Sequence, residues 1–433
     1  MKFTLRLLLL TVVIFSFTNN VYSQRYLSDL DTSLFIKDTV RAFLKRFDNI
    51  HFSGYIQPQF QVAESKGARS YSAGDFSQYS NSRFMLRRAR IKLDYFDYTT
   101  DSLPKVLFTF QFDATERGVN VRDMFLRLYE TRGHNFSLTM GLFARPFGYE
   151  VNLSSGFRES PERGRMSQIL MPIERDLGAM ITYEPLRRNA KNHWLKIDAG
   201  VFNGPGLSGT TDFDSRKDII ARAIIKPIKL SSFEIGGGLS ILQGGWRQQS
   251  KFVYTSTTSP AGKGFAVDSS LSNIGKISPR KYYGADAQLK WKHGWGETEL
   301  RGEYWKGTQT GTAATTVNPG NIPETPQYIR HFDGAFIYFL QDIVNHKNQI
   351  VLKYDWYDPN TKVKAHDIGK AGTNLTVADI KYSTFGFGFT HYFSNYLKAL
   401  VYYDIVTNEK TQLTDHTTDS KDNIFTLRLQ YRF

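Results

Sequence analysis

The sequence predicts an all-β protein, a transmembrane antiparallel β-barrel of about 16 strands with long loops at one end and short turns at the other. Three observations predict this fold. Segments of about ten residues alternate apolar and polar side chains, connections alternate between short and long, and aromatic residues gather at the strand ends. The 433 residues include 33 Phe and 24 Tyr but no Cys, which excludes a disulfide framework and a cysteine-ligated metal site.

Residues 1–23 have the composition of a cleaved signal peptide. Basic Lys2 and Arg6 precede an apolar run over 7–17, which is too short to span a bilayer as a helix. The mature chain then begins near Gln24 and stays basic, because loss of the two cations lowers the formal net charge of +14 by only two. An exported protein does not meet nucleic acid, so we expect small anionic solutes or lipid phosphates as its counter-charges.

Residues 24–50 lack the alternation of a strand. Within 38–47, the spacing of Val40, Phe43, Leu44 and Phe47 is that of one face of a short helix. We therefore expect a periplasmic N-terminal segment over 24–50, followed by the barrel over 51–433.

The barrel segments each have one apolar and one polar face. In the last of them, every second residue from Phe425 to Phe433 is apolar, and Thr426, Arg428, Gln430 and Arg432 fill the gaps. The apolar face suits lipid, and about 16 strands enclose a lumen wide enough for water. The predicted strands are centred near residues 57, 89, 109, 125, 140, 180, 198, 222, 237, 287, 301, 336, 353, 387, 401 and 428.

The connections between these segments alternate in length. A soluble β-sandwich shows the same alternation, but aromatic residues at strand ends, such as Tyr95, Trp291 and Tyr431, match the interfacial girdles of a membrane barrel. We expect short periplasmic turns near 97–102, 131–135, 184–192, 227–232, 292–296, 341–347 and 393–396. We expect long extracellular loops over 63–81, 114–120, 144–176, 203–217, 242–281, 306–330, 359–380 and 406–421.

A basic cluster occupies the second predicted strand. If Met85, Ala89, Ile91, Leu93 and Tyr95 form its outward face, then Arg88, Arg90 and Lys92 point into the lumen. Arg83 and Arg87 have outward parity and would reach lipid phosphates. Two interpretations of the lumen cations stay open. They guide anions, or they form a salt-bridged wall with carboxylates of the same inward parity: Asp94, Asp113, Asp123, Glu299, Glu303 and Asp355.

The connection over 144–176 is rich in arginine. We expect it to fold inward and narrow the pore, where guanidinium groups can grip a phosphate or a carboxylate through paired hydrogen bonds. The alternative is a solvated surface loop with ordinary charges. The arginines concerned are Arg145, Arg158, Arg163, Arg165 and Arg175.

Signatures of enzymes and cofactor sites are missing. The chain has no G-x-S-x-G elbow and no H-E-x-x-H pair, and its nine histidines do not have metal-ligand spacing. We therefore predict no enzymatic activity, no catalytic residues, no metal and no cofactor.

Three stretches resemble the phosphate-selective porin O and P family. They are FSGYIQPQF over 52–60, RFMLRRARIKL over 83–93 and GLFARPFGYE over 141–150, with further similarity over 201–204 and 222–227 and in the terminal aromatic residue. The resemblance implies a sixteen-stranded homotrimeric porin of the outer membrane, with its third loop in the lumen and arginines along an anion path. It places Arg88, Arg90 and Arg145 in matching motifs, and it implies that the C-terminal strand is recognised by the barrel-assembly machinery.

The sequence thus predicts a porin of the cell outer membrane for passive diffusion of small solutes, biased toward anions such as phosphate. The alternative is a general or oligosaccharide-type porin without anion specificity. We expect these pore-lining residues: Arg88, Arg90, Lys92, Arg145, Arg158, Arg163, Arg165, Arg175, Arg222, Lys353 and Arg428.

Overall fold

The computed structural model describes residues 49–187, 189–209 and 212–433. The compact unit Ile50–Phe433 contains all the strands of the barrel. The predicted signal peptide and the N-terminal segment as far as residue 48 lie outside the described residues. Among the described residues, no helix is long and apolar enough to cross a membrane.

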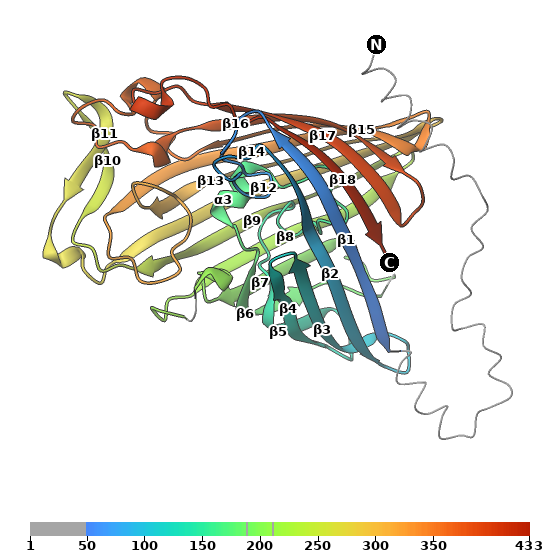
Figure 1. The fold of residues 1–433 in the computed structure, drawn as a ribbon. Helices are drawn as coiled ribbons and strands as arrows, with labels where there is room; N and C mark the ends of the chain where they lie inside the picture. Colours follow the sequence, from blue (N-terminus) through green and yellow to red (C-terminus); the bar gives the residue numbers. More distant parts are fainter. Residues whose placement is uncertain (1–48, 188, 210–211) are drawn as a thin grey trace, which may run out of the picture. The chain divides into compact units, whose positions relative to one another are not determined.

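Sixteen antiparallel strands form a closed barrel, which confirms the predicted fold class (Figure 1). Every predicted strand centre falls within one of them. The barrel strands are β1 (Ile50–Ala63), β2 (Ser82–Tyr98), β3 (Pro104–Thr115), β4 (Gly118–Tyr129), β5 (Phe136–Ala144), β6 (Arg175–Tyr183), β7 (Leu195–Phe202), β8 (Asp218–Leu230), β9 (Phe233–Arg247), β12 (Ile277–His293), β13 (Gly296–Gly311), β14 (Gln327–Ile343), β15 (Asn345–Asp358), β16 (Tyr382–Tyr392), β17 (Leu397–Asn408) and β18 (Ile424–Arg432).

The barrel closes where the first strand pairs with the last. Tyr55 lies opposite Arg432 in the β1–β18 register. Beyond that pair, the N–H and C=O of Gly54 bond with the C=O and N–H of Phe433 at 3.1 and 3.0 Å. The ring of Phe433 stacks on that of Phe52 at 5.5 Å between centroids. The chain terminus is thus paired into the wall, so no free sheet edge remains there.

The two faces of the strands differ as the alternation predicts. In β18, Leu427, Leu429 and Tyr431 are exposed on the outside, whereas Arg428 and Gln430 are only 2% and 4% exposed on the inside. Large apolar side chains are exposed on nearly every barrel strand in this way. The outer surface therefore suits hydrocarbon, and the polar residues line the interior.

The connections largely follow the predicted alternation, and we call the two ends of the barrel the loop end and the turn end. One prediction is wrong: β3 and β4 are joined by only Glu116 and Arg117, so the expected long loop over 114–120 is a tight turn. β3 and β4 continue up to this turn because apolar and polar residues still alternate on both sides of it.

The loop end carries structure that the alternation does not reveal. Between β9 and β12 lies a hairpin of β10 (Val253–Ser259) and β11 (Gly262–Asp268), and β10 pairs in parallel with the start of β14. Short helical turns are α3 (Arg165–Leu170), η3 (Gly206–Ser208), η4 (Leu271–Asn273), η5 (Ala365–Asp367), η6 (Val377–Asp379) and η7 (Thr414–His416).

Candidate functional site

A β-bulge in β2 changes which side chains face the interior. The register pairs Gln57 with Arg88 but Pro58 with Leu86, so Arg87 is an extra residue. Toward the loop end, the inward parity therefore shifts by one. Arg83 Nε donates to Gln61 Oε1 at 3.0 Å, and Met85 Sδ accepts from Gln59 Nε2 at 3.2 Å.

Because of this bulge, the outward orientation predicted for Arg83, Met85 and Arg87 is wrong. Gln59 and Gln61 are buried inside the barrel, so Met85 and Arg83 face inward with them. Arg87 also turns inward, to Glu162. Arg83 and Arg87 are therefore not lipid-facing. Arg88 and Arg90 lie on the turn-end side of the bulge and keep the predicted inward parity, at 8% and 4% exposure.

The segment over 145–174, including α3, runs across the interior of the barrel. It bonds to strands on several sides of the wall. Tyr55 Oη of β1 lies 2.6 Å from Ser155 Oγ, Gln430 Nε2 of β18 donates to the Gly156 carbonyl at 2.8 Å, and Glu303 of β13 accepts the Tyr149 N–H at 2.8 Å. These contacts span the lumen from wall to wall.

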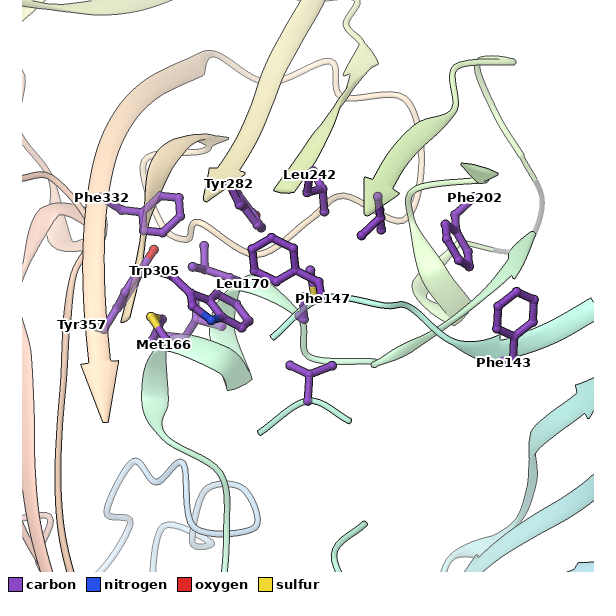
Figure 2. Close-up of a cluster of buried hydrophobic side chains, with 14 of the residues drawn as sticks. Phe143, Phe147, Met166, Leu170, Phe202, Leu242, Tyr282, Trp305, Phe332 and Tyr357 are labelled. Atoms are coloured by element: carbon purple, nitrogen blue, oxygen red, sulfur yellow. The ribbon is translucent and has the colours of Figure 1, made fainter. Parts of the chain in front are cut away.

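A buried apolar cluster holds this interior segment against one side of the barrel (Figure 2). The ring of Phe147 meets that of Trp305 edge-on at 4.7 Å, and both side chains have no exposed surface. Each large apolar side chain buried in this way contributes about 1.5–3 kcal/mol. The cluster comprises Phe143, Phe147, Val151, Met166, Ile169, Leu170, Met171, Met180, Phe202, Ile220, Leu242, Tyr282, Trp305, Phe332 and Tyr357.

Next to Phe147, the chain needs a glycine. Gly148 has a φ of +70°, and a Cβ added there would lie 2.2 Å from Glu303 Oε1. We expect Gly148→Ala to loosen the segment, because alanine is strained at this φ and displaces the carboxylate that holds Tyr149 and Glu150. Limited proteolysis should cut the variant faster within 145–174.

The matched control is Gly74→Ala in the loop between β1 and β2. Gly74 also has a positive φ, +91°, but an added Cβ there would meet no atom within 4 Å. Proteolysis of this variant within 145–174 should stay at the wild-type rate. Equal cutting of the two variants would mean that backbone strain alone explains the effect and that the Glu303 contact does not anchor the segment.

Two carboxylates of the interior segment each hold three arginines. Glu162 accepts two bonds from Arg88, at 2.7 and 3.1 Å, two from Arg87 and one from Arg428. Burial would raise the pKa of Glu162, but the three guanidinium groups outweigh it and hold the pKa well below its usual range. Glu174 has a similarly lowered pKa, since Arg122, Arg163 and Arg175 surround it.

Most of the other predicted cations are also paired. Arg90 lies 2.9 Å from Asp113, and Lys92 lies 2.7 Å from Asp94. The inward parity predicted for these two aspartates is thereby confirmed. The remaining pairs are Arg175 with Asp123 at 3.0 Å, Arg222 with Asp286 at 2.8 Å and Lys353 with Asp355 at 3.3 Å. A salt-bridged wall therefore describes much of the predicted pore lining.

Three arginines of the interior segment lack a carboxylate within salt-bridge distance among the described residues. Arg145 donates to the carbonyls of Ile173 and Gly204. Burial and the nearby Arg280 lower its pKa to about 10. Arg158 donates only to the Leu153 carbonyl, at 3.3 Å. Arg165 lies between two tyrosine rings.

A cavity of about 310 Å³, here called the inner cavity, lies between the interior segment and the wall formed by β2 to β7. Its charged lining is Arg90, Lys92, Arg127, Arg175 and Lys196 against Asp123 and Asp198. Arg127 donates to Thr139 at 2.8 Å and has no carboxylate in salt-bridge distance among the described residues.

The sequence predictions missed Arg127 and Lys196. Arg127 shares the parity of Asp123, which was assigned inward, so the alternation already pointed to it. Lys196 shares the parity of Asp198 in β7, and its Nζ lies 3.5 Å from Asp198 Oδ2 and 3.6 Å from Glu184 Oε2.

A second cavity of about 320 Å³, here called the outer cavity, lies at the loop end. Its lining comes from the loops after β1, β13, β15 and β17 and from α3. The charged residues are Arg69, Arg165 and Lys421 against Asp422. Among the predicted residues, only Arg165 reaches this cavity, and Arg90, Lys92 and Arg175 reach the inner one.

No protein-family model matches the chain, and no curated protein matches its sequence. Solved structures do match. The outer-membrane channel DcaP of Acinetobacter baumannii is 12% identical with a TM-score of 0.55, over 89% of this chain and 97% of that one. OprB of Pseudomonas putida is 8% identical with a TM-score of 0.55, over 92% and 96%.

A loop-deletion mutant of OmpT, an outer membrane protein of Vibrio cholerae, is 11% identical with a TM-score of 0.50, over 89% of this chain and 99% of that one. At these identities, the likeness establishes the fold and not the solute. The chain has the fold of sixteen-stranded outer-membrane channels.

Proposed function

We propose that the protein is an outer-membrane porin through which small solutes diffuse passively, with a bias toward anions such as phosphate. The observation that carries this proposal is the inner cavity, whose lining holds five cations, one of which, Arg127, has no carboxylate within salt-bridge distance among the described residues. Such a lining lowers the electrostatic barrier for an anion and raises it for a cation. No catalytic role belongs to this proposal.

The interior segment over 145–174 is the constriction in this proposal. It lines both the inner and the outer cavity, and the apolar cluster and Glu303 hold it across the lumen. Glu162 and Glu174 of the segment are paired with arginines, whereas Arg145, Arg158 and Arg165 have no carboxylate within salt-bridge distance among the described residues. The segment sets the width of the path in this proposal, and its unpaired arginines act together with Arg127 of the wall to favour anions.

The general porin remains the second candidate, because one observation favours it. Arg88, Arg90 and Arg428 are already bonded to protein carboxylates or amides, so they offer few free donors to a passing solute. If the cations of the inner cavity did not determine the electrostatic potential along the lumen, the channel would have no preference for anions.

Replacing two wall cations tests the anion bias. We expect Arg127→Gln with Lys196→Gln to shift the reversal potential in a tenfold KCl gradient toward the value for cations, because two of the five inner-cavity cations are lost. Planar-bilayer recording of the variant measures this shift.

The control for this variant removes the same charges from the surface. Arg132 and Lys347 are exposed at the turn end, and Arg132→Gln with Lys347→Gln should leave the reversal potential close to that of the wild type, because exposed charges are screened by salt. A reversal potential that moves equally in both variants would contradict a role for the inner cavity.

Location in the outer membrane follows from this proposal, with insertion by the barrel-assembly machinery through β18 and lipid against the apolar outer face. Association into a homotrimer stays a prediction from the family resemblance. The export signal over 1–23 and the periplasmic segment over 24–50 likewise stay predictions.

A further inference from the structure

The guanidinium of Arg165 is held between two aromatic rings at the boundary of the outer cavity. Its Cζ lies 4.5 Å from the ring centroid of Tyr71 and 4.4 Å from that of Tyr382. Tyr71 comes from the loop after β1, and Tyr382 begins β16. These two cation–π contacts hold the guanidinium in place, and its N–H edge remains for hydrogen bonding.

That edge has no partner among the described residues. The Arg165 side chain donates no hydrogen bond, and its Nε is buried without a partner. The residue is only 5% exposed. Its backbone N–H does bond to Asp355 Oδ1 at 3.1 Å, which positions the residue but does not use the side chain. A buried charged donor without an acceptor is costly, and a bound oxyanion would remove that cost.

The rest of the outer cavity offers polar groups. Exposed Thr315 and Ser420 add hydroxyl groups, whereas Tyr357 is only 1% exposed and its hydroxyl lies 3.0 Å from Thr316 Oγ1. The one lining carboxylate, Asp422, already accepts the Asn408 amide at 3.1 and 3.2 Å. A volume of about 320 Å³ lies in the range of pockets for small organic ligands. A bare inorganic ion would leave the aromatic wall unused.

We propose that the outer cavity is a binding site for a small organic oxyanion, a phosphate monoester or carboxylate carried on a hydroxylated ring. Arg165 binds the oxyanion through its free edge, and the tyrosine rings pack against the ring of the solute. Arg69 and Lys421 add positive charge at the same cavity. This inference rests on the proposed function, because it names the solute class that an anion-biased porin gathers at its loop end.

Isothermal titration of the full-length protein in detergent tests the site with four probes: glucose 6-phosphate, glucuronate, glucose and inorganic phosphate. We expect glucose 6-phosphate or glucuronate to bind more tightly than glucose and inorganic phosphate. The tighter of the first two tells whether a phosphate or a carboxylate is preferred. Arg165→Gln should weaken that binding by about tenfold or more, since a charge-assisted pair is lost.

Arg132→Gln, the same change on the exposed surface, should bind like the wild type. A second variant, Tyr382→Leu, removes one stacking ring and should weaken binding of the ringed probes more than that of inorganic phosphate. Equal affinity of the wild type and Arg165→Gln for the preferred probe would overturn the proposal. So would inorganic phosphate that binds as tightly as glucose 6-phosphate, or glucose that binds as tightly as either anion.

The reversal potential in KCl alone separates this inference from the proposed function. Anion-biased current without binding of any ringed probe would contradict the inference and leave the anion-biased porin intact. Binding that depends on Arg165, together with current that lacks anion bias, would contradict the proposed function and leave the site.

Discussion

Glu162→Gln is expected to raise the anion preference of the channel and to lower its stability. The carboxylate neutralises Arg87, Arg88 and Arg428 inside the barrel, so its loss leaves three guanidinium groups facing one neutral amide. Breaking a buried ion pair by removing one partner costs about 3–5 kcal/mol. The unpaired cations then attract mobile anions from the lumen.

Two measurements check this expectation. The reversal potential in a KCl gradient should move further toward the anion value, and thermal unfolding should occur at a lower temperature than in the wild type. The matched control is Glu159→Gln in the same segment, because Arg301 loses that partner but keeps Glu299 at 3.3 Å. If Glu162→Gln left both readouts unchanged, the ion cluster would not shape the field in the lumen.

Phe147→Ala is expected to release the constriction and to increase the single-channel conductance severalfold. Phe147 has no exposed surface and packs against Trp305 and Tyr282. Truncating a buried phenylalanine costs about 3–5 kcal/mol, and here the loss falls on the segment that fills the lumen. The freed segment should fluctuate, so the open-channel current should also become noisier.

Phe157→Ala provides the control for Phe147→Ala. It makes the same truncation in the same segment, but Phe157 is 59% exposed, and its ring lies 4.5 Å from Arg432 Cζ. Its conductance should stay close to that of the wild type. A quiet channel of ordinary conductance after Phe147→Ala would show that the apolar cluster does not hold the constriction.

The strands could be predicted from the sequence because lipid and water impose a period of two on every one of them. Leu427 and Arg428 illustrate this, since they are adjacent in sequence but face opposite sides of the wall. The hairpin of β10 and β11 escaped prediction because it lies beyond the barrel wall. Its first strand, Val253–Ser259, is mostly Ser and Thr and has no apolar face.

The candidate site was predictable only in part. Inward parity correctly placed Arg88 and Arg90, but one inserted residue at Arg87 reversed the parity for Arg83 and Met85. A bulge of this kind leaves the local composition unchanged, so the alternation did not reveal it.

Pairing was harder to predict than parity, because it joins residues distant in sequence. Arg88 and Arg428 meet at Glu162, which is 74 residues from the first and 266 from the second. The apolar anchor was also unpredictable. Phe147, Met166 and Leu170 follow neither a strand period nor a continuous helical one, since they pack from turns and from the short α3.

The most direct test of the anion-biased porin is the reversal potential of the wild-type protein in a planar bilayer under a KCl gradient, recorded with and without phosphate. The inner cavity predicts a potential with the sign of chloride permeation and a current that added phosphate reduces. A reversal potential near zero, or one with the sign of potassium permeation, would contradict the anion-biased porin.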